Sequence, residues 1–225
     1  DPGPDPDDVK ALLASAIVHK QRQLQLCGVI ANGGGQPVRR ARLARCILDR
    51  LHEPHIPVGI GSAGVPSAEQ PHEMLLAGYS EVDDARLLDG RALFRSVLRA
   101  ARPQSLVIVL ISSLRDFADV VAEEPELVRR ATAEVVIQGG LTPDPTTPYG
   151  YRPDASQNNV FDPDAARSVY DFCFGARLKM AVVSREAVPL LPMQLAKSFA
   201  LRTRSPLLVY LANAQFLGLA GLWGK

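Results

Sequence analysis

The sequence predicts an α/β protein with a mainly parallel central sheet that helices cover on both faces. Continuously apolar runs such as Ser105 to Ile111 are typical of strands buried on both sides. Segments such as Pro37 to Leu51 carry apolar residues at helical spacing. Because the two kinds of segment alternate along the chain, they favour a parallel sheet with right-handed connections.

The predicted strands are short apolar runs. In parallel sheets, ligands bind at the carboxyl ends of the strands, so polar residues directly after these runs are candidate site residues. Two segments with weak periodicity and several prolines are predicted to be irregular, Ser62 to Leu88 and Leu141 to Asn159. The predicted strands are Leu24 to Ala31, Pro57 to Gly61, Ser105 to Ile111, Glu134 to Gln138 and Leu178 to Val183.

The predicted helices alternate with these strands. The aspartates just before the first helix are expected to cap its N-terminus, because short acidic side chains accept hydrogen bonds from the first amides of a helix. From Met193 onward the tail is expected to be mostly helical. The other predicted helices are Val9 to Gln21, Pro37 to Leu51, Gly90 to Ala101, Leu114 to Ala122, Pro125 to Ala131 and Asp162 to Phe174.

Bulk properties exclude several classes of protein. The 225 residues have a formal net charge of +1, which gives no electrostatic footprint for nucleic acid or an anionic membrane. No apolar run is long enough to cross a bilayer, and no signal peptide is visible. The chain starts at Asp1, and we expect its natural start to lie further upstream. Cys27, Cys46 and Cys173 lack metal-binding spacing and are expected to be buried free thiols.

Other polar clusters have ordinary structural interpretations. The four histidines do not cluster with carboxylates in the sequence, and His52 and His55 are expected to be exposed beside a turn. Gly59 to Gly64 spells GxGxxG after a strand, but Pro66 and Pro71 disfavour the helix that a dinucleotide site needs. A basic cluster at helical spacing is expected to form a solvated helix face; it comprises Arg39, Arg40, Arg42 and Arg45.

The strongest candidate for chemistry is the run from Asp1 to Asp8, which reads DPGPDPDD. Its four carboxylates repel one another. One interpretation is an acidic, proline-stiffened start of a helix. The other is a site for a hard cation such as calcium, which takes oxygen ligands from several carboxylates. The spacing alone leaves both interpretations open.

This run resembles the Asp-Pro-Gly-x-Asp-Asp signature of the inosine-uridine preferring nucleoside hydrolases, with two extra residues after the glycine. Its spelling is similar to that of the XopQ-like bacterial type III effectors, as is the segment Val183 to Pro189. The resemblance implies a nucleoside hydrolase-like, Rossmann-like fold and one domain over residues 1–225 that lacks the family's first strand and C-terminal part. Further matching pieces, in the family's order, are Leu26 to Gly35, Ile56 to Gly61, Gln138 to Gly140 and Asn158 to Ala166.

The resemblance implies a calcium site. Asp1 and Asp8 match the two calcium-binding aspartates of the signature, and Asp7 matches the general base. The backbone carbonyl of Arg115 falls near a further calcium ligand. The loop there, Ser112 to Asp116, reads SSLRD where the family usually has Gly-Pro-Leu-Thr-Asn. A further aspartate ligand and a histidine near the leaving base have no match in this chain.

The resemblance also implies a ribose pocket. Asn32 lies in a loop that usually offers an asparagine to the ribose, and Asn158, with Asn159 beside it, matches a second ribose-binding asparagine. We expect Asn32 and Asn158 to face the same pocket. Tyr79 is a candidate to stack on a base, although an ordinary surface tyrosine is the competing interpretation.

The function that the resemblance implies is that of a calcium-dependent N-ribohydrolase. Such a protein cleaves or binds the N-glycosidic bond of a nucleoside or a related ribosyl compound. The alternative is a catalytically weak module that binds a ribosyl ligand and acts through host protein partners. As a bacterial effector it would be secreted into a host cell, and otherwise it would be cytoplasmic. Nucleic acid and membranes are not expected partners.

Overall fold

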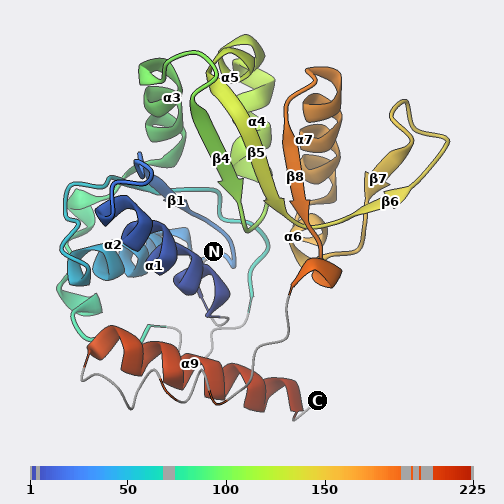
Figure 1. Cartoon of the computed structure of the whole chain (residues 1–225). Helices are drawn as coiled ribbons and strands as arrows, with labels where there is room; N and C mark the ends of the chain where they lie inside the picture. The colour runs from blue at the N-terminus through green and yellow to red at the C-terminus, as the bar shows by residue number, and fades with distance from the viewer. Residues whose placement is uncertain are drawn as a thin grey trace.

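The computed structural model of the chain describes residues 2, 3, 6–67, 74–188, 194, 198 and 205–223, with side chains up to residue 217. Within these residues, helices pack against two parallel sheets, and an antiparallel hairpin projects to one side (Figure 1). The predicted α/β class with a mainly parallel sheet is confirmed.

Six of the eight described strands form two parallel sheets of three strands each, and the other two form a hairpin. The strands are β1 (Val29–Ala31), β2 (Val58–Ile60), β3 (Leu88–Asp89), β4 (Leu106–Leu110), β5 (Thr132–Gln138), β6 (Leu141–Pro143), β7 (Tyr151–Pro153) and β8 (Met180–Val183). Sheet A has the order β1-β2-β3 and sheet B has the order β4-β5-β8. Every pairing in these two sheets is parallel, whereas β6 and β7 pair antiparallel.

The helices lie close to the predicted segments. They are α1 (Asp7–Lys20), α2 (Pro37–Arg50), α3 (Gly90–Ala100), α4 (Arg115–Glu123), α5 (Pro125–Ala131), α6 (Gln157–Val160), α7 (Pro163–Gly175) and α9 (Pro206–Trp223), with 3-10 turns η1 (Tyr79–Glu81), η2 (Asp84–Arg86) and η3 (Arg185–Ala187). The predicted aspartate cap of α1 is wrong. The helix begins earlier than expected, so Pro6 is the N-cap, and Asp7 and Asp8 lie in the first turn. Their charges still favour the helix dipole there.

The first predicted strand is longer than the observed one. β1 contains only Val29–Ala31 because its neighbour β2 is equally short, and the register pairs Val29 with Val58 and Ala31 with Ile60. Among the described strands, none pairs with the residues before Val29.

The predicted loop from Leu141 to Asn159 contains the β6–β7 hairpin and the short helix α6. The rings of Tyr149 and Tyr151 stack on Phe174 of α7, at centroid distances of 5.3 and 6.3 Å. Local periodicity did not predict the hairpin because these contacts with a distant helix help to hold it in place.

Sheet A has helices on both faces, as alternation along its strands dictates. Ala31 and Val58 point into the core that α1 and α2 share, whereas Ile30 packs into the second core beyond the sheet. Gly59 faces α3, where an added Cβ would lie 2.7 Å from the Cα of Gly90. This close approach of strand and helix requires glycine.

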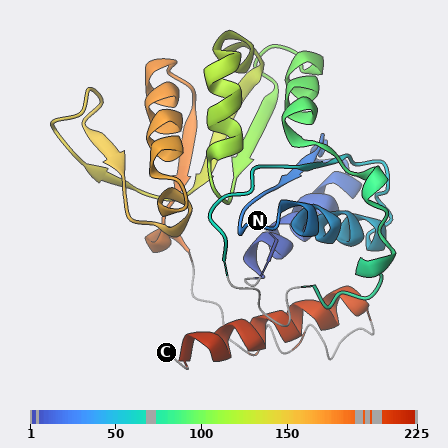
Figure 2. The same cartoon turned by 180° about the vertical axis from the view of Figure 1, so that it is seen from behind.

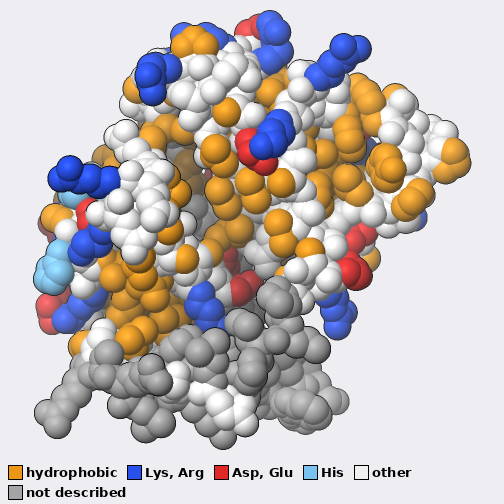
Figure 3. Space-filling model, viewed as in Figure 1, with side chains coloured by type: hydrophobic (Ala, Val, Ile, Leu, Met, Phe, Trp, Pro, Cys, Tyr) orange, Lys and Arg blue, Asp and Glu red, His pale blue; other side chains and the backbone are white. Residues whose placement is uncertain are grey.

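Sheet B buries one face against α4 and α7, as seen from both sides in Figures 1 and 2. Val135 and Ile137 are fully buried on that face. On the opposite face, Val107 and Val109 are 52% and 57% exposed. Figure 3 shows hydrophobic side chains gathered over this face of β4, β5 and β8.

The tail closes the first core. Tyr210 and Leu211 of α9 are buried in the cluster formed with α1 and α2. The prediction of a helical tail is confirmed for α9, whereas most of the tail before it lies outside the described residues. Among the described helices, none has the length and apolar character that a membrane span requires.

The cysteines are free thiols, as predicted. Cys46 and Cys173 are buried, whereas Cys27 is only half-buried. Burial raises the pKa of the Cys173 thiol to about 12 and also raises the pKa of Cys46. Both buried thiols are therefore kept in the protonated, unreactive form.

The predicted solvated arginine face is wrong for two of its four members, because Arg40 and Arg45 are each only 2% exposed. The guanidinium of Arg45 donates to the carbonyl oxygens of Ile56 (2.5 Å) and Glu53 (2.8 Å) and to the carboxylate of Asp49 (3.1 Å). The loop after α2 thus obtains hydrogen bonds for its carbonyls from a buried side chain, as buried polar groups require.

We expect Arg45→Ala to lower the free energy of unfolding by about 3 kcal/mol, because it strands buried carbonyls and removes an ion-pair partner of Asp49. The control is Arg42→Ala on the same helix, where Arg42 pairs with Asp84 at the surface. Loss of an exposed pair should change stability by less than about 1 kcal/mol. Urea unfolding of the variants measures both, and equal effects would contradict a special role for Arg45.

Candidate functional site

The carboxyl ends of β1 and β4 meet at the side chain of Asn32. Asn32 directly follows β1 and is 4% exposed. Its amide nitrogen donates to the carbonyl of Ser113 (3.1 Å) and to the carboxylate of Asp116 (2.5 Å). Its amide oxygen accepts a hydrogen bond from the hydroxyl of Ser112. Asn32 therefore lies at the edge where parallel sheets place ligand sites.

Asp116 is a site residue that the sequence analysis did not select. One carboxylate oxygen accepts the backbone amide of Ser62 (2.8 Å), and the other accepts the hydroxyl of Ser62 (3.1 Å) and the amide of Asn32. A Cβ at Gly61 would lie 2.8 Å from this carboxylate, so the loop after β2 needs a glycine there. The sequence signal that could have identified Asp116 is its place shortly after the apolar run of β4, in the first turn of α4.

Asp7 and Asn158 are connected through Gln138, the last residue of β5. The side-chain amide of Gln138 donates to the carboxylate of Asp7 (3.3 Å). The side-chain amide of Asn158 donates to the backbone carbonyl of Gln138 (3.0 Å). Residues of α1, β5 and α6 thus gather at one end of sheet B. Sequence analysis missed Gln138, although its place just before Gly139 at a strand end could have indicated it.

Asp8 lies next to Asp7 in a more enclosed place. It is 9% exposed, whereas Asp7 is exposed. Burial raises the pKa of the Asp8 carboxyl to about 6; the charge of Asp7 adds to the rise, and Arg40 opposes it. The predicted ligand Asp1 lies outside the described residues.

These residues fit a hard cation. Asp7 and Asp8 offer only carboxylate oxygens, which are the ligands that calcium prefers. A divalent cation beside the buried Asp8 would favour its ionised form against the desolvation that raises its pKa. The donor set and the electrostatics of the described pair are therefore compatible with the predicted calcium site.

The side chain of Arg115 forms ion pairs with two aspartates. Its guanidinium forms a bidentate ion pair with Asp162, at 2.7 and 2.9 Å, and lies 3.5 Å from Asp119. It is the first residue of α4, so its carbonyl belongs to the helix, where carbonyls point along the axis towards the C-terminus. The predicted carbonyl ligand remains a prediction.

Two further predicted residues have structural contacts. Asn159 is 1% exposed, and its amide donates to the carbonyl of Gly140 and to the carboxylate of Asp154, both at 3.0 Å. It ties together the loop behind Asn158. Tyr79 lies under Arg42 of α2, with the guanidinium carbon 5.6 Å from the ring centroid. None of its described contacts is with the asparagines or with Asp7 and Asp8.

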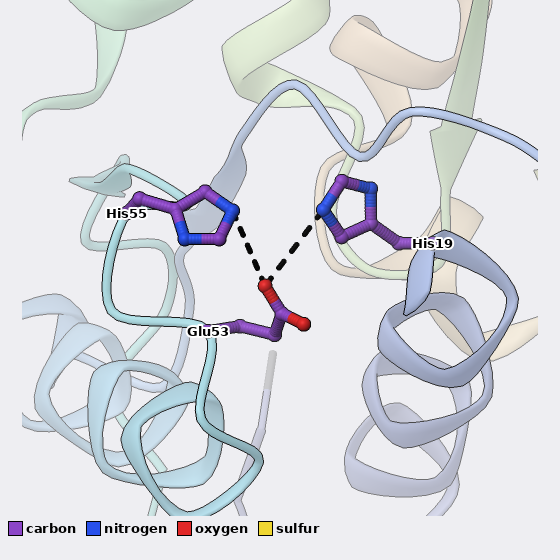
Figure 4. A group of neighbouring side chains, drawn as sticks. All are labelled: His19, Glu53 and His55. Carbon is purple, nitrogen blue, oxygen red and sulfur yellow. Dashed lines mark ion pairs between the residues drawn. The ribbon is translucent and has the colours of Figure 1, made fainter. Parts of the chain in front are cut away.

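The expectation that the histidines do not cluster with carboxylates is wrong. His19, Glu53 and His55 lie together and could hold a metal ion (Figure 4). The contact joins the end of α1 to the loop after α2, which sequence spacing does not show. His55 is exposed, as expected.

The α/β fold and the polar residues at the carboxyl ends of its strands together indicate the class of protein. The chain belongs to the inosine-uridine preferring nucleoside hydrolase family, whose model matches residues 1–210. This confirms the resemblance drawn from the sequence. No curated protein matches the chain.

Two solved effector structures are similar over the whole chain. The type III effector protein XopQ, solved in complex with adenosine diphosphate ribose, shares 28% identity with a TM-score of 0.84. The effector protein XOO4466 shares 28% identity with a TM-score of 0.82. The alignments cover 100% of this chain but only 65% of each of those chains.

A nucleoside hydrolase from Bacillus anthracis, described as inosine-uridine preferring, has the same fold. It shares 16% identity with a TM-score of 0.67, and the alignment covers 96% of this chain and 74% of that one. At this level of identity the likeness concerns the fold alone.

We expect Asp116→Ala to destabilise the protein by about 3 kcal/mol, because it removes the carboxylate acceptor of the buried Asn32 amide and of the half-buried Ser62 amide. The matched control is Asp119→Ala on the same helix, whose ion pairs with Arg91 and Arg115 lie at the surface. That change should affect stability by less than about 1 kcal/mol. Thermal and urea unfolding provide the comparison. If the two variants unfold alike, Asp116 does not join the strand ends.

Proposed function

We propose that the chain binds a ribosyl compound at the carboxyl edge of its sheets, in the presence of calcium, and hydrolyses the N-glycosidic bond. One observation carries the proposal. The exposed Asp7 and the buried Asp8 are consecutive residues in the first turn of α1, and Gln138 connects Asp7 to Asn158. Membership of the nucleoside hydrolase family supports the reaction class.

The two carboxylates suit different tasks. Asp7 is accessible and accepts a hydrogen bond from Gln138, so it is placed to take a proton from an attacking water. Asp8 is enclosed and suits a metal ligand that needs no contact with bulk water. Calcium, when bound, would supply a Lewis acid that orients the water and the ribose hydroxyls.

The asparagines suit ribose recognition. Asn158 is half-buried, and its side-chain amide already faces the carboxyl end of β5. Asn32 is fixed by three neighbours at the end of β1, so it offers a rigid polar wall. Rigid groups of this kind hold a ribose while its C1′–N bond breaks through an oxocarbenium-like state. Asn159 holds the loop beside Asn158 in place through Gly140 and Asp154.

The second candidate is a ribosyl-binding effector with little turnover that acts through host proteins. Its support is the similarity to XopQ, which was solved with adenosine diphosphate ribose. Adenosine diphosphate ribose is therefore a sensible first ligand to test, beside a panel of nucleosides. The same similarity supports delivery into a host cell by a bacterial secretion system.

We expect Asp7→Asn to slow ribose release by roughly 10²–10⁴-fold, the usual contribution of a positioned base, with little change in ligand affinity. Asp8→Ala should instead lower calcium affinity and ribosyl-ligand affinity together, because it removes a metal ligand. Ribose release and calorimetric binding at saturating calcium measure both effects.

The matched controls are Asp164→Asn and Asp164→Ala, at an exposed aspartate in the first turn of α7. They should leave ligand binding and ribose release unchanged. Binding without release by the native chain, abolished in Asp8→Ala, would favour the effector candidate. If neither Asp7 nor Asp8 variants differ from the native chain, the acidic run is only a helix start and the proposed function fails.

A further inference from the structure

A second group of ligating side chains lies at the other end of α1. His19 is in the last turn of α1, and Glu53 and His55 are in the loop between α2 and β2. Figure 4 shows the two imidazoles approaching the same carboxylate oxygen from opposite sides. The Nε2 atoms of His55 and His19 lie 3.2 and 3.8 Å from Oε2 of Glu53. One ligand atom from each residue lies within 4.8 Å of the others.

We propose that His19, Glu53 and His55 bind one zinc ion. Two imidazole nitrogens with one carboxylate oxygen form a three-ligand set that zinc uses while keeping a fourth position open. Zinc bonds of about 2.0–2.2 Å at tetrahedral angles separate neighbouring ligand atoms by about 3.4 Å, and the two observed separations bracket that value. Calcium and magnesium prefer all-oxygen sets, so they do not suit this group.

The loop that carries two of the ligands is held in place before any ion binds. The buried Arg45 donates to the carbonyl oxygens of Glu53 and Ile56, on either side of His55. The amide of Glu53 donates to the carbonyl of Leu48 at 2.8 Å. The ligand positions therefore need little rearrangement to close around an ion.

The charge balance of the group also favours a cation. The Glu53 side chain is only 8% exposed, and its ion pairs within the described part of the chain are with His19 and His55. Histidine, unlike arginine or lysine, is not a permanently charged residue, and its neutral imidazole is the form that ligates a metal. A bound divalent cation would give this buried carboxylate a full counter-charge. The His55 side chain is 68% exposed, so the open coordination position is next to solvent.

Zinc binding has a specific consequence for His19. The backbone amide of Leu26 donates to Nδ1 of His19 at 3.2 Å. A neutral imidazole that ligates through Nε2 carries its proton on Nδ1. The amide of Leu26 then faces a donor instead of an acceptor, so this hydrogen bond breaks when the ion binds. The Leu26 amide is therefore a reporter of ligation by His19.

The zinc site is separate from the proposed ribosyl site. Asp7 and His19 lie at opposite ends of α1, about 18 Å apart along a helix that rises 1.5 Å per residue. The ion would fasten the end of α1 to the loop after α2. The inference does not rest on the proposed function and stands if no ribosyl compound binds.

The test is a zinc titration of the full chain after removal of metals, with a chromophoric chelator as competitor. We expect one zinc per chain and a loss of affinity of at least roughly tenfold in His55→Gln, since even second-shell losses weaken metal sites 10–100-fold. His55 is exposed, so this variant keeps its fold. The matched control is His52→Asn, three residues away, where the backbone is left-handed (φ 58°) and asparagine is tolerated. Its zinc affinity should be unchanged.

A second measurement identifies the ligand on α1. The amide resonance of Leu26 should shift on zinc addition in the native chain and in His52→Asn, but not at the same zinc concentration in His55→Gln. The proposal is overturned if zinc does not bind one to one. It is overturned as well if zinc binds the native chain and His55→Gln with equal affinity, because zinc held by the cysteines would be insensitive to this substitution. It is also overturned if zinc binds while the Leu26 amide stays unchanged.

Discussion

The carboxylate of Asp116 fixes how the two parallel sheets meet. Among the described strands, no ladder of backbone hydrogen bonds joins β1 to β4. Asp116 instead accepts from Asn32, after β1, and from Ser62, after β2, while its own helix follows β4. Because buried donors need acceptors, this carboxylate helps to determine the relative position of the strand ends, together with the contacts of Asn32 with Ser112 and Ser113. The edge that gathers Asp7, Gln138 and Asn158 depends on that alignment.

Another charged side chain, the buried guanidinium of Arg40, lies against described residues near the N-terminus. The guanidinium of Arg40 lies so close to Gly3 and Gly34 that a Cβ at either position would overlap it. Gly34 also has a left-handed backbone (φ 64°), which favours glycine. Arg40 therefore lies between Gly3 and the loop after β1, and its charge lowers the pKa of Asp8 against the effect of burial. Arg40 thus opposes the rise in this pKa that the charge of Asp7 causes.

Local patterns predicted what local interactions decide. The helical spacing located α2 and α7, and the continuous apolar runs located β4 and β5. Asn32 and Asn158 were instead indicated by the resemblance to the nucleoside hydrolases. The errors concern side chains with partners outside their own helix or strand. The charges of Arg40 and Arg45 look solvated on a helical wheel, yet loop carbonyls and close glycines enclose them. Asp116, Gln138 and the His19 group escaped notice for the same reason.

The position of α1 links the two candidate sites. Its apolar contacts are few, with Val9, Leu12 and Ala16 as its buried hydrophobic residues. Polar contacts at its ends supplement them: Asp7 accepts from Gln138 in the first turn, and His19 accepts from Leu26 and faces Glu53 in the last. An ion at the His19 end would therefore restrain the same helix that presents Asp7 and Asp8 at the carboxyl edge.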